Sequence, residues 1–141
     1  MDETLTDLAT RLRRSVMRLS RRLRLSAAGS WSPVQTSILS WLDQYESLTL
    51  GELAAFEQVR PPSITPLVTA LRVAGLVACR KDDSDRRTTR VTLTPAGRRE
   101  LNTVRRRRTE FLEQKLLALS PAERARAVAL VEFLESLLEE S

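Results

Sequence analysis

The sequence of 141 residues predicts a mainly α-helical fold that carries one small β-hairpin. Three observations predict it. Six segments have the character of helices, and in four of them apolar residues recur at roughly the spacing of a helix face that packs against a core. Ser32, Thr49, Thr94 and Ser120 stand at the expected starts of four of these segments, where a hydroxyl can cap a helix. Between the fourth and fifth segments, residues 77–93 include two runs in which side chains alternate as they do in strands.

The first three expected helices precede a proline-rich segment. The first runs for about six turns, until the small residues 27–29 end its pattern. Its apolar stripe consists of Leu5, Leu8, Leu12, Val16, Leu19 and Leu23. Its other faces carry Arg11, Arg13, Arg14, Arg18, Arg21, Arg22 and Arg24. Ser32 followed by Pro33 starts the second helix, and Thr49 with Glu52 forms a capping box that opens a short third helix.

The fourth expected helix lies within residues 60–75. Its apolar positions are Ile64, Leu67, Val68 and Leu71. Gly75 is a natural C-terminal stop because glycine readily adopts the left-handed conformation. A proline beyond the first turn costs a backbone hydrogen bond, so Pro66 should lie within the first turn. We therefore expect Ser63 or a residue close to it to be the N-cap, with residues 61–62 extended before it.

Two short strands and two long helices complete the chain. Side chains alternate over residues 77–81 and again over residues 89–93, and the polar residues between them form a turn, so we expect a hairpin. Thr94 caps a long helix that ends near Leu119, and Ser120 caps the last one. Two short helices followed at once by a hairpin are expected for a winged helix-turn-helix. The predicted fold class is therefore mainly α with a small β-hairpin wing.

Composition narrows the function. A single cysteine excludes an intramolecular disulfide, and the absence of histidine removes the commonest general base and metal ligand, so we expect no enzymatic activity, no metal and no cofactor.

No apolar run is long enough to span a bilayer and no export signal begins the chain, so we expect it to stay in the cytoplasm. The net charge is +5, and nearly all basic residues are arginines, which pair well with phosphates. A GC-rich genome is an alternative source of arginine.

Two segments carry side chains suited to duplex DNA, as in a winged helix whose second short helix enters the major groove. The candidate recognition-helix residues are Arg60, Pro62, Ser63, Thr65, Pro66 and Thr69. Backbone N–H groups at the start of this helix are expected to attract a phosphate. The candidate wing residues are Asp85, Arg86, Arg87 and Arg90, of which Asp85 can brace Arg87 while the arginines approach the DNA backbone or the minor groove. The alternatives are that Ser63 only caps its helix and that the turn is only solvated.

The wing and its flanks resemble the MarR family of bacterial regulators. Asp85 and Arg87 match its Asp-x-Arg pattern, and Leu93, Thr94 and Gly97 match the Leu-Thr-x-x-Gly that follows. The resemblance covers nearly the whole chain. It implies one MarR-type domain in a homodimer whose dimerisation helices lie in residues 1–30 and 98–141, with a DNA-binding lobe at 31–97. Pairing agrees with the apolar stripe of the first helix and with the leucine-rich termini, which would otherwise leave a long apolar surface exposed. Burial within one subunit is the alternative.

The resemblance also implies a repressor that binds a pseudo-palindromic operator and is released by a small amphipathic, often aromatic ligand between the dimer helices and the lobe. The candidate ligand-pocket residues are Met17, Trp31, Trp41 and Tyr45, although aromatic residues at helical spacing are also typical of a core. Many relatives carry arginine where this chain has Pro66, so base readout shifts to neighbouring polar residues. Cys79 is expected to be a small core residue. The alternative function is a protein-interaction module that does not read DNA.

Overall fold

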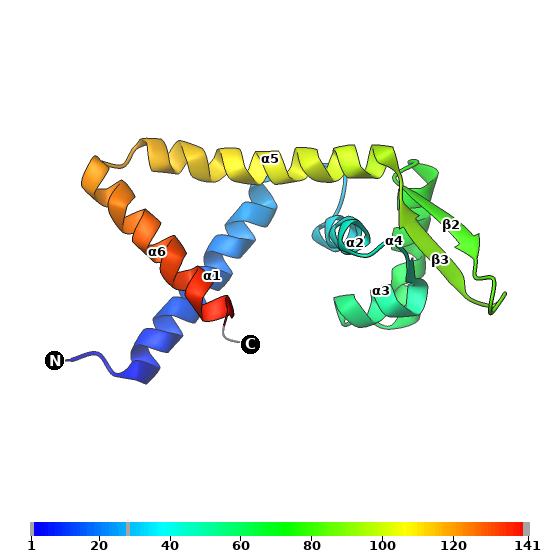
Figure 1. Cartoon of the computed structure of the whole chain (residues 1–141), viewed down its shortest axis with the longest axis horizontal. Coiled ribbons are helices and arrows are strands. Elements are labelled where there is room, and N and C mark those ends of the chain that lie inside the picture. The colour runs from blue at the N-terminus through cyan, green and yellow to red at the C-terminus, as the bar shows by residue number, and fades with distance from the viewer. Residues whose placement is uncertain (1, 28, 140–141) are drawn as a thin grey trace. The chain divides into compact units, whose positions relative to one another are not determined.

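A computed structural model of the chain describes residues 2–27 and 29–139 (Figure 1). The elements in order are α1 (Leu5–Ser26), α2 (Pro33–Gln44), β1 (Leu48–Thr49), α3 (Leu50–Glu57), α4 (Pro61–Val73), β2 (Val77–Lys81), β3 (Thr89–Leu93), α5 (Pro95–Leu117) and α6 (Pro121–Glu139). The chain divides into two compact units, Met1–Arg108 and Thr109–Ser141. The predicted order of four helices, a hairpin and two further helices is confirmed, with α5 ending two residues before the expected Leu119.

Helix starts follow the hydroxyl residues of the sequence. The Ser32 hydroxyl accepts from the backbone N–H of Gln35 at 3.2 Å, and the Gln35 side chain accepts from the N–H of Ser32 at 3.1 Å. Thr49 and Glu52 form the predicted capping box of α3. Ser120 makes the same exchange with Glu123 before α6. Each pair satisfies two backbone donors that a helix end otherwise leaves unpaired, so these boundaries are set locally.

The expected start of α4 is wrong. The helix begins at Pro61 rather than after Ser63, its N-cap is Arg60, and Pro66 lies inside it. Prolines at the first two positions cost nothing because those N–H groups have no helical partner. Pro66 itself is exposed, and the burial of the opposite side of the helix outweighs its local cost. The buried face consists of Ile64, Val68 and Leu71.

The hairpin is part of a three-stranded antiparallel sheet with the strand order β1-β3-β2. Strands β2 and β3 have the predicted bounds, and Cys79 lies opposite Val91 in their register. The two-residue strand β1, which the sequence did not predict, adds Leu48 opposite Val91. Cys79 is half-buried and packs against the core, as expected for a small apolar residue. The sheet thus fixes the base of the hairpin to the segment before α3.

The core of the winged lobe is built from α2, α3, α4, the sheet and the start of α5. Its fully buried side chains are Ile38, Leu39, Leu53, Ile64, Leu71, Val91 and Leu101. Two turns close around it. The helix α4 ends at Val73, and the predicted stop Gly75 follows with φ +78°, while the N–H of Leu76 donates to the carbonyl of Leu71 at 2.9 Å. Thr94 donates its hydroxyl to the carbonyl of Gly75 at 2.6 Å and accepts from the N–H of Gly97 at 3.0 Å.

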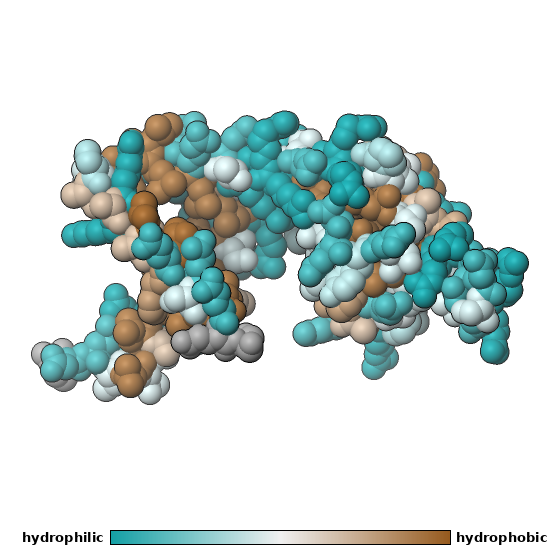
Figure 2. Space-filling model, viewed as in Figure 1, coloured by the Kyte–Doolittle hydropathy of each residue, from teal (hydrophilic) through white to brown (hydrophobic). Residues whose placement is uncertain are grey.

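The helices α1 and α6 carry their apolar side chains on the surface. No residue described in either helix is buried. Apolar side chains gather over both helices, whereas hydrophilic side chains cover the hairpin (Figure 2). The large apolar side chains that remain exposed on α1 include Leu5, Leu8, Val16, Met17 and Leu19, and those on α6 include Val128, Val131, Phe133, Leu137 and Leu138. None of the described helices has the length and apolar character needed to cross a membrane.

Candidate nucleic-acid interface

The exposed face of α4 carries the polar residues expected to meet DNA. All six candidates of this segment are exposed: Arg60, Pro62, Ser63, Thr65, Pro66 and Thr69. They lie away from the buried residues Ile64 and Val68 of the same helix. The hydroxyl of Thr69 donates to the carbonyl of Thr65 at 2.8 Å, which leaves its oxygen able to accept a further hydrogen bond. The structure therefore brings these six residues together on the surface of one helix.

The start of α4 differs from the expected phosphate site. Its first two residues are prolines, which have no N–H, and the N–H of Ser63 donates to the carbonyl of Arg60 at 2.9 Å. The expectation that backbone N–H groups at this helix end attract a phosphate is therefore wrong. The polar groups that remain at this end are the side chains of Arg60 and Ser63, so any phosphate contact there depends on side chains.

The turn of the hairpin presents two arginines to solvent. Asp85 organises the turn, because its carboxylate accepts from the N–H of Arg87 at 3.1 Å and from the hydroxyl of Thr88 at 3.3 Å. The Arg87 guanidinium lies 3.5 Å from the Asp85 carboxylate, and the Arg87 side chain is 94% exposed. Asp85 therefore holds the Arg87 side chain only weakly. Arg86 is also exposed. The hairpin tip projects beyond the helices of the lobe in Figure 1, which places Arg86 and Arg87 where a partner can reach them.

Arg90 has a different environment from Arg86 and Arg87. Its side chain is 30% exposed; its Nε donates to Asp82 Oδ1 at 3.0 Å, and its Nη1 donates to the Ser47 hydroxyl at 3.0 Å. Hydrogen bonds from Ser84 and Arg90 lower the pKa of the Asp82 carboxyl. Arg90 thus ties the base of the hairpin to the segment before β1, and this contact suits a residue that positions the wing.

We expect Arg90→Met to lower the affinity for duplex DNA about fivefold, because a partly exposed ion pair is worth roughly 1 kcal/mol. The slope of log affinity against log salt should stay unchanged, since no phosphate contact is lost. Fluorescence anisotropy at several salt concentrations measures both quantities. Asp82→Asn tests the same contact from the other side. Removing an acidic group should by itself increase the affinity for DNA, whereas loss of the ion pair with Arg90 should lower it if that pair holds the wing in place. An increased affinity of Asp82→Asn would show that Arg90 does not act through this contact.

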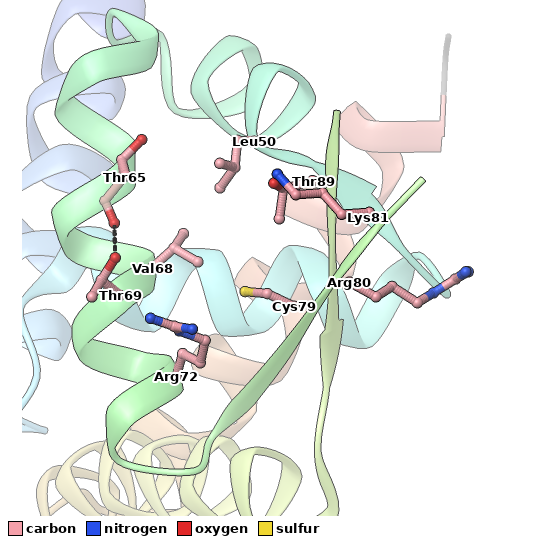
Figure 3. A pocket seen from close by; sticks show the side chains of 9 residues that line it. All are labelled: Leu50, Thr65, Val68, Thr69, Arg72, Cys79, Arg80, Lys81 and Thr89. Atoms are coloured by element: carbon pink, nitrogen blue, oxygen red, sulfur yellow. Dashed lines mark hydrogen bonds between the residues drawn. The ribbon is translucent and has the colours of Figure 1, made fainter. Parts of the chain in front are cut away.

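A groove of about 330 Å³ separates α4 from the hairpin (Figure 3). Thr65, Thr69 and Arg72 line it from α4, while Cys79 points into it from β2 and Arg80 points away. Lys81 and Thr89 complete its edge along the strands. Arg72 and Lys81 are cationic lining residues that the sequence analysis did not single out. Helical spacing could have identified Arg72, because it follows Thr65 and Thr69 at seven and three residues on one helix face.

The four residues expected to line a ligand pocket are dispersed. Trp41 and Tyr45 stack on Phe56, with ring centroids 4.7 Å and 5.4 Å away, and the indole N–H of Trp41 donates to Glu57 at 3.0 Å. Trp31 lines a separate cavity of about 80 Å³, and Met17 is 61% exposed on α1. The structure therefore brings Trp41 and Tyr45 together but not with Trp31. Within residues 2–27 and 29–139, no group of three His, Cys, Asp or Glu side chains is arranged to hold a metal ion.

Comparisons with known proteins agree with this geometry. The sequence profile described as the MarR family matches residues 31–89. A Mycobacterium bovis protein described as an uncharacterized HTH-type transcriptional regulator is 35% identical over 137 residues, which cover 95% of this chain and 94% of that protein. A crystal structure of a Pseudomonas aeruginosa protein described as a transcriptional regulator superposes with a TM-score of 0.79 at 34% identity, covering 98% of this chain and 100% of that one.

A structure of S. aureus MepR bound to an oligodeoxyribonucleotide has a TM-score of 0.69 at 21% identity, covering 96% of this chain and 99% of that one, and supports the fold. The winged lobe, the three-stranded sheet and the full-length similarity to named regulators point to one conclusion. The chain belongs to the MarR family of helix-turn-helix transcriptional regulators.

Proposed function

We propose that this protein is a cytoplasmic repressor that binds a pseudo-palindromic DNA operator as a homodimer and performs no chemistry of its own. The exposed polar face of α4 would enter the major groove, while Arg86 and Arg87 at the hairpin tip would reach the adjacent backbone or minor groove. The single observation that carries the proposal is that one winged lobe presents both surfaces, free of the core and rich in cationic and hydroxyl groups.

The proposed dimer uses segments 1–30 and 98–141, and the lobe at 31–97 reads DNA. A helix with a continuous apolar stripe exposed to water is unfavourable in a single chain, and association of identical chains removes such surface from water. The exposed stripes of α1 and α6 support this arrangement. Twofold symmetry would then place two copies of α4 about one helical turn of DNA apart, roughly 10 base pairs.

Binding to the chain's own upstream DNA tests the proposal. At about 150 mM salt, an electrophoretic shift assay should show tighter binding to that DNA than to random duplex of equal length. Phosphate contacts contribute affinity for any duplex, and direct base contacts add affinity for the operator alone. Footprinting should reveal two protected half-sites whose centres lie about 10 base pairs apart. Equal affinity for both duplexes would refute sequence-specific regulation, and silent neutralisation of Arg86 and Arg87 would instead favour a protein-interaction module.

The repressor is proposed to be released by a small ligand. Such a ligand acts only if it binds the free form and the DNA-bound form with different affinities. A cavity that contacts both α1 and the lobe helices would supply this difference, since its occupation can change how these elements pack. The dispersed positions of Met17, Trp31, Trp41 and Tyr45 favour a site built around other residues.

A further inference from the structure

The exposed face of α4 carries a row of rings and methyl groups. Residues that follow one another by four, three and four positions lie on one side of a helix. On α4 these residues are Pro62, Pro66, Thr69 and Val73, which we call the apolar row. All four are exposed, and Val73 is 80% exposed. The opposite side of the helix supplies the buried residues of the lobe, so the apolar row is available to a partner.

The helix α4 lacks the side chains that identify most bases. Residues 61–71 include no charged side chain and no side-chain amide. Guanine is read mainly by Arg or Lys, adenine by Asn or Gln, and cytosine by Asp or Glu. Hydroxyl groups and apolar contact with the C5 methyl group of thymine are the other ways to read a base edge in the major groove. Between Arg60 and Arg72, the helix has only these two ways.

Thr69 has its hydroxyl hydrogen engaged within the helix. It donates to the backbone carbonyl of Thr65 at 2.8 Å (Figure 3). A hydroxyl has a single hydrogen, so Thr69 can accept from a base but cannot also donate to the acceptors of guanine. Toward a base pair, Thr69 therefore offers an acceptor oxygen and a methyl group. An A·T pair provides both complements, namely the adenine amino group and the thymine methyl group.

Cationic side chains border the apolar row instead of interrupting it. Arg60 is the N-cap of α4, and Arg72 lines the groove between α4 and the hairpin (Figure 3). Arg86 and Arg87 extend the positive charge to the hairpin tip. The major groove of DNA has the matching distribution, because phosphates border it and base edges form its floor. The cations thus suit the phosphates, and the apolar row suits the base edges between them.

We propose that the apolar row reads thymine methyl groups, so that each half-site of the operator contains T·A pairs whose C5 methyl groups pack against Pro66 and Thr69. This inference rests on the proposed function and names its specificity at the level of the bases. Contact between the two sets of apolar groups removes both from water, which favours thymine over bases that present only polar groups there.

Selection from a pool of random duplexes, followed by replacement of thymine with uracil, tests the proposal. Selection identifies the bound sequence without assuming where it lies in the genome, and we expect T·A pairs in both half-sites. Uracil lacks the C5 methyl group but keeps every hydrogen-bonding group of thymine. Burial of one methyl group corresponds to about fourfold in affinity, so losing one contact in each half-site should weaken binding about fifteenfold. Uracil outside the half-sites should have no effect.

Two variants at one position separate the methyl contact from the hydroxyl contact. Thr69→Ser removes the methyl group and keeps the hydroxyl, so it should reduce the preference for thymine over uracil by about fourfold or more. Thr69→Val removes the hydroxyl and keeps a methyl group, so it should keep or increase that preference. Thr10→Ser is the matched control, because Thr10 on α1 donates to the carbonyl of Thr6 at the same distance of 2.8 Å. It should change neither affinity nor preference.

A modified base distinguishes methyl contact from an effect of uracil on DNA shape. Cytosine in place of a contacted thymine should weaken binding, and 5-methylcytosine at the same place should recover part of the loss, since it carries a methyl group at the same ring position. Equal binding of the cytosine and 5-methylcytosine duplexes would overturn the proposal. So would a half-site insensitive to uracil, or a preference for thymine that is lost in Thr69→Val and kept in Thr69→Ser.

The outcomes keep this inference apart from the proposed function. A selected sequence that is indifferent to thymine methyl groups would overturn methyl readout and leave sequence-specific regulation standing. A selected sequence that needs those methyl groups, with no preference for the upstream DNA, would support methyl readout and refute the proposed operator. Selection that enriches no sequence would refute both.

Discussion

Gly97→Ala is expected to lower the free energy of unfolding by about 3 kcal/mol, because it overpacks a junction that cannot move easily. A Cβ at this position would collide with the backbone carbonyl oxygen of Leu76 and lie 2.7 Å from Cδ1 of Leu93. That carbonyl also accepts the N–H of Thr94 at 3.1 Å, so relief of the clash would separate α5 from the sheet. Urea unfolding followed by circular dichroism measures the change.

Gly51→Ala is the matched control for Gly97→Ala. Gly51 lies in α3, where an added Cβ would approach only the Thr49 hydroxyl at 3.9 Å. Alanine stabilises a helix relative to glycine by up to about 1 kcal/mol, so this variant should be as stable as the natural chain or more so. If both variants unfolded alike, the close approach at Gly97 would not explain why glycine stands there.

The double variant Arg86→Ala/Arg87→Ala is expected to bind duplex DNA about thirtyfold more weakly at 150 mM salt. Each lost phosphate contact reduces the slope of log affinity against log salt by about 0.9. At this salt concentration, that change corresponds to a loss of affinity of roughly fivefold. The loss should be similar for operator and random duplex, since wing contacts to the backbone carry little sequence information. Anisotropy titrations over a range of salt concentrations give both numbers.

Arg13→Ala/Arg14→Ala provides the control for charge. These adjacent arginines are exposed on α1, outside the winged lobe, and their removal changes the net charge by the same amount. Their loss should change affinity by less than about twofold, because they lie outside the proposed DNA contacts and salt screens the long-range attraction of exposed charges. Equal effects of the two double variants would mean that net charge, and not the wing, attracts DNA.

The elements set by local chemistry were predictable from the sequence. Ser32 with Pro33, Thr49 with Glu52, and Ser120 with Pro121 each fix a helix start through neighbours within three residues, and the structure has those starts. The strands β2 and β3 were predictable for the same reason, because the turn between them is short and polar. The Leu-Thr-x-x-Gly pattern was identified by resemblance, and the structure gives it a physical role as the junction of α4, the sheet and α5.

Features that depend on distant residues were not predictable. The start of α4 was placed wrongly because the local cost of Pro66 was visible, whereas the compensating burial of Ile64 and Val68 depends on the whole lobe. The strand β1 has two residues, and its partner Val91 lies 43 residues after Leu48. A cavity lined by Arg24, Thr36 and Arg108 was not predicted, because these residues come from three separate helices and no spacing in the sequence connects them.

If the chain pairs as proposed, the exposed apolar side chains of α1 and α6 give the terminal helices a different source of stability from that of the winged lobe. The lobe closes its own core around residues such as Leu39 and Leu71, so its unfolding equilibrium is a property of one chain. Helices that find apolar partners only by association gain stability from mass action, which depends on how many copies surround them. In a cell, the abundance of this regulator would therefore set the integrity of its terminal helices as well as the occupancy of its targets.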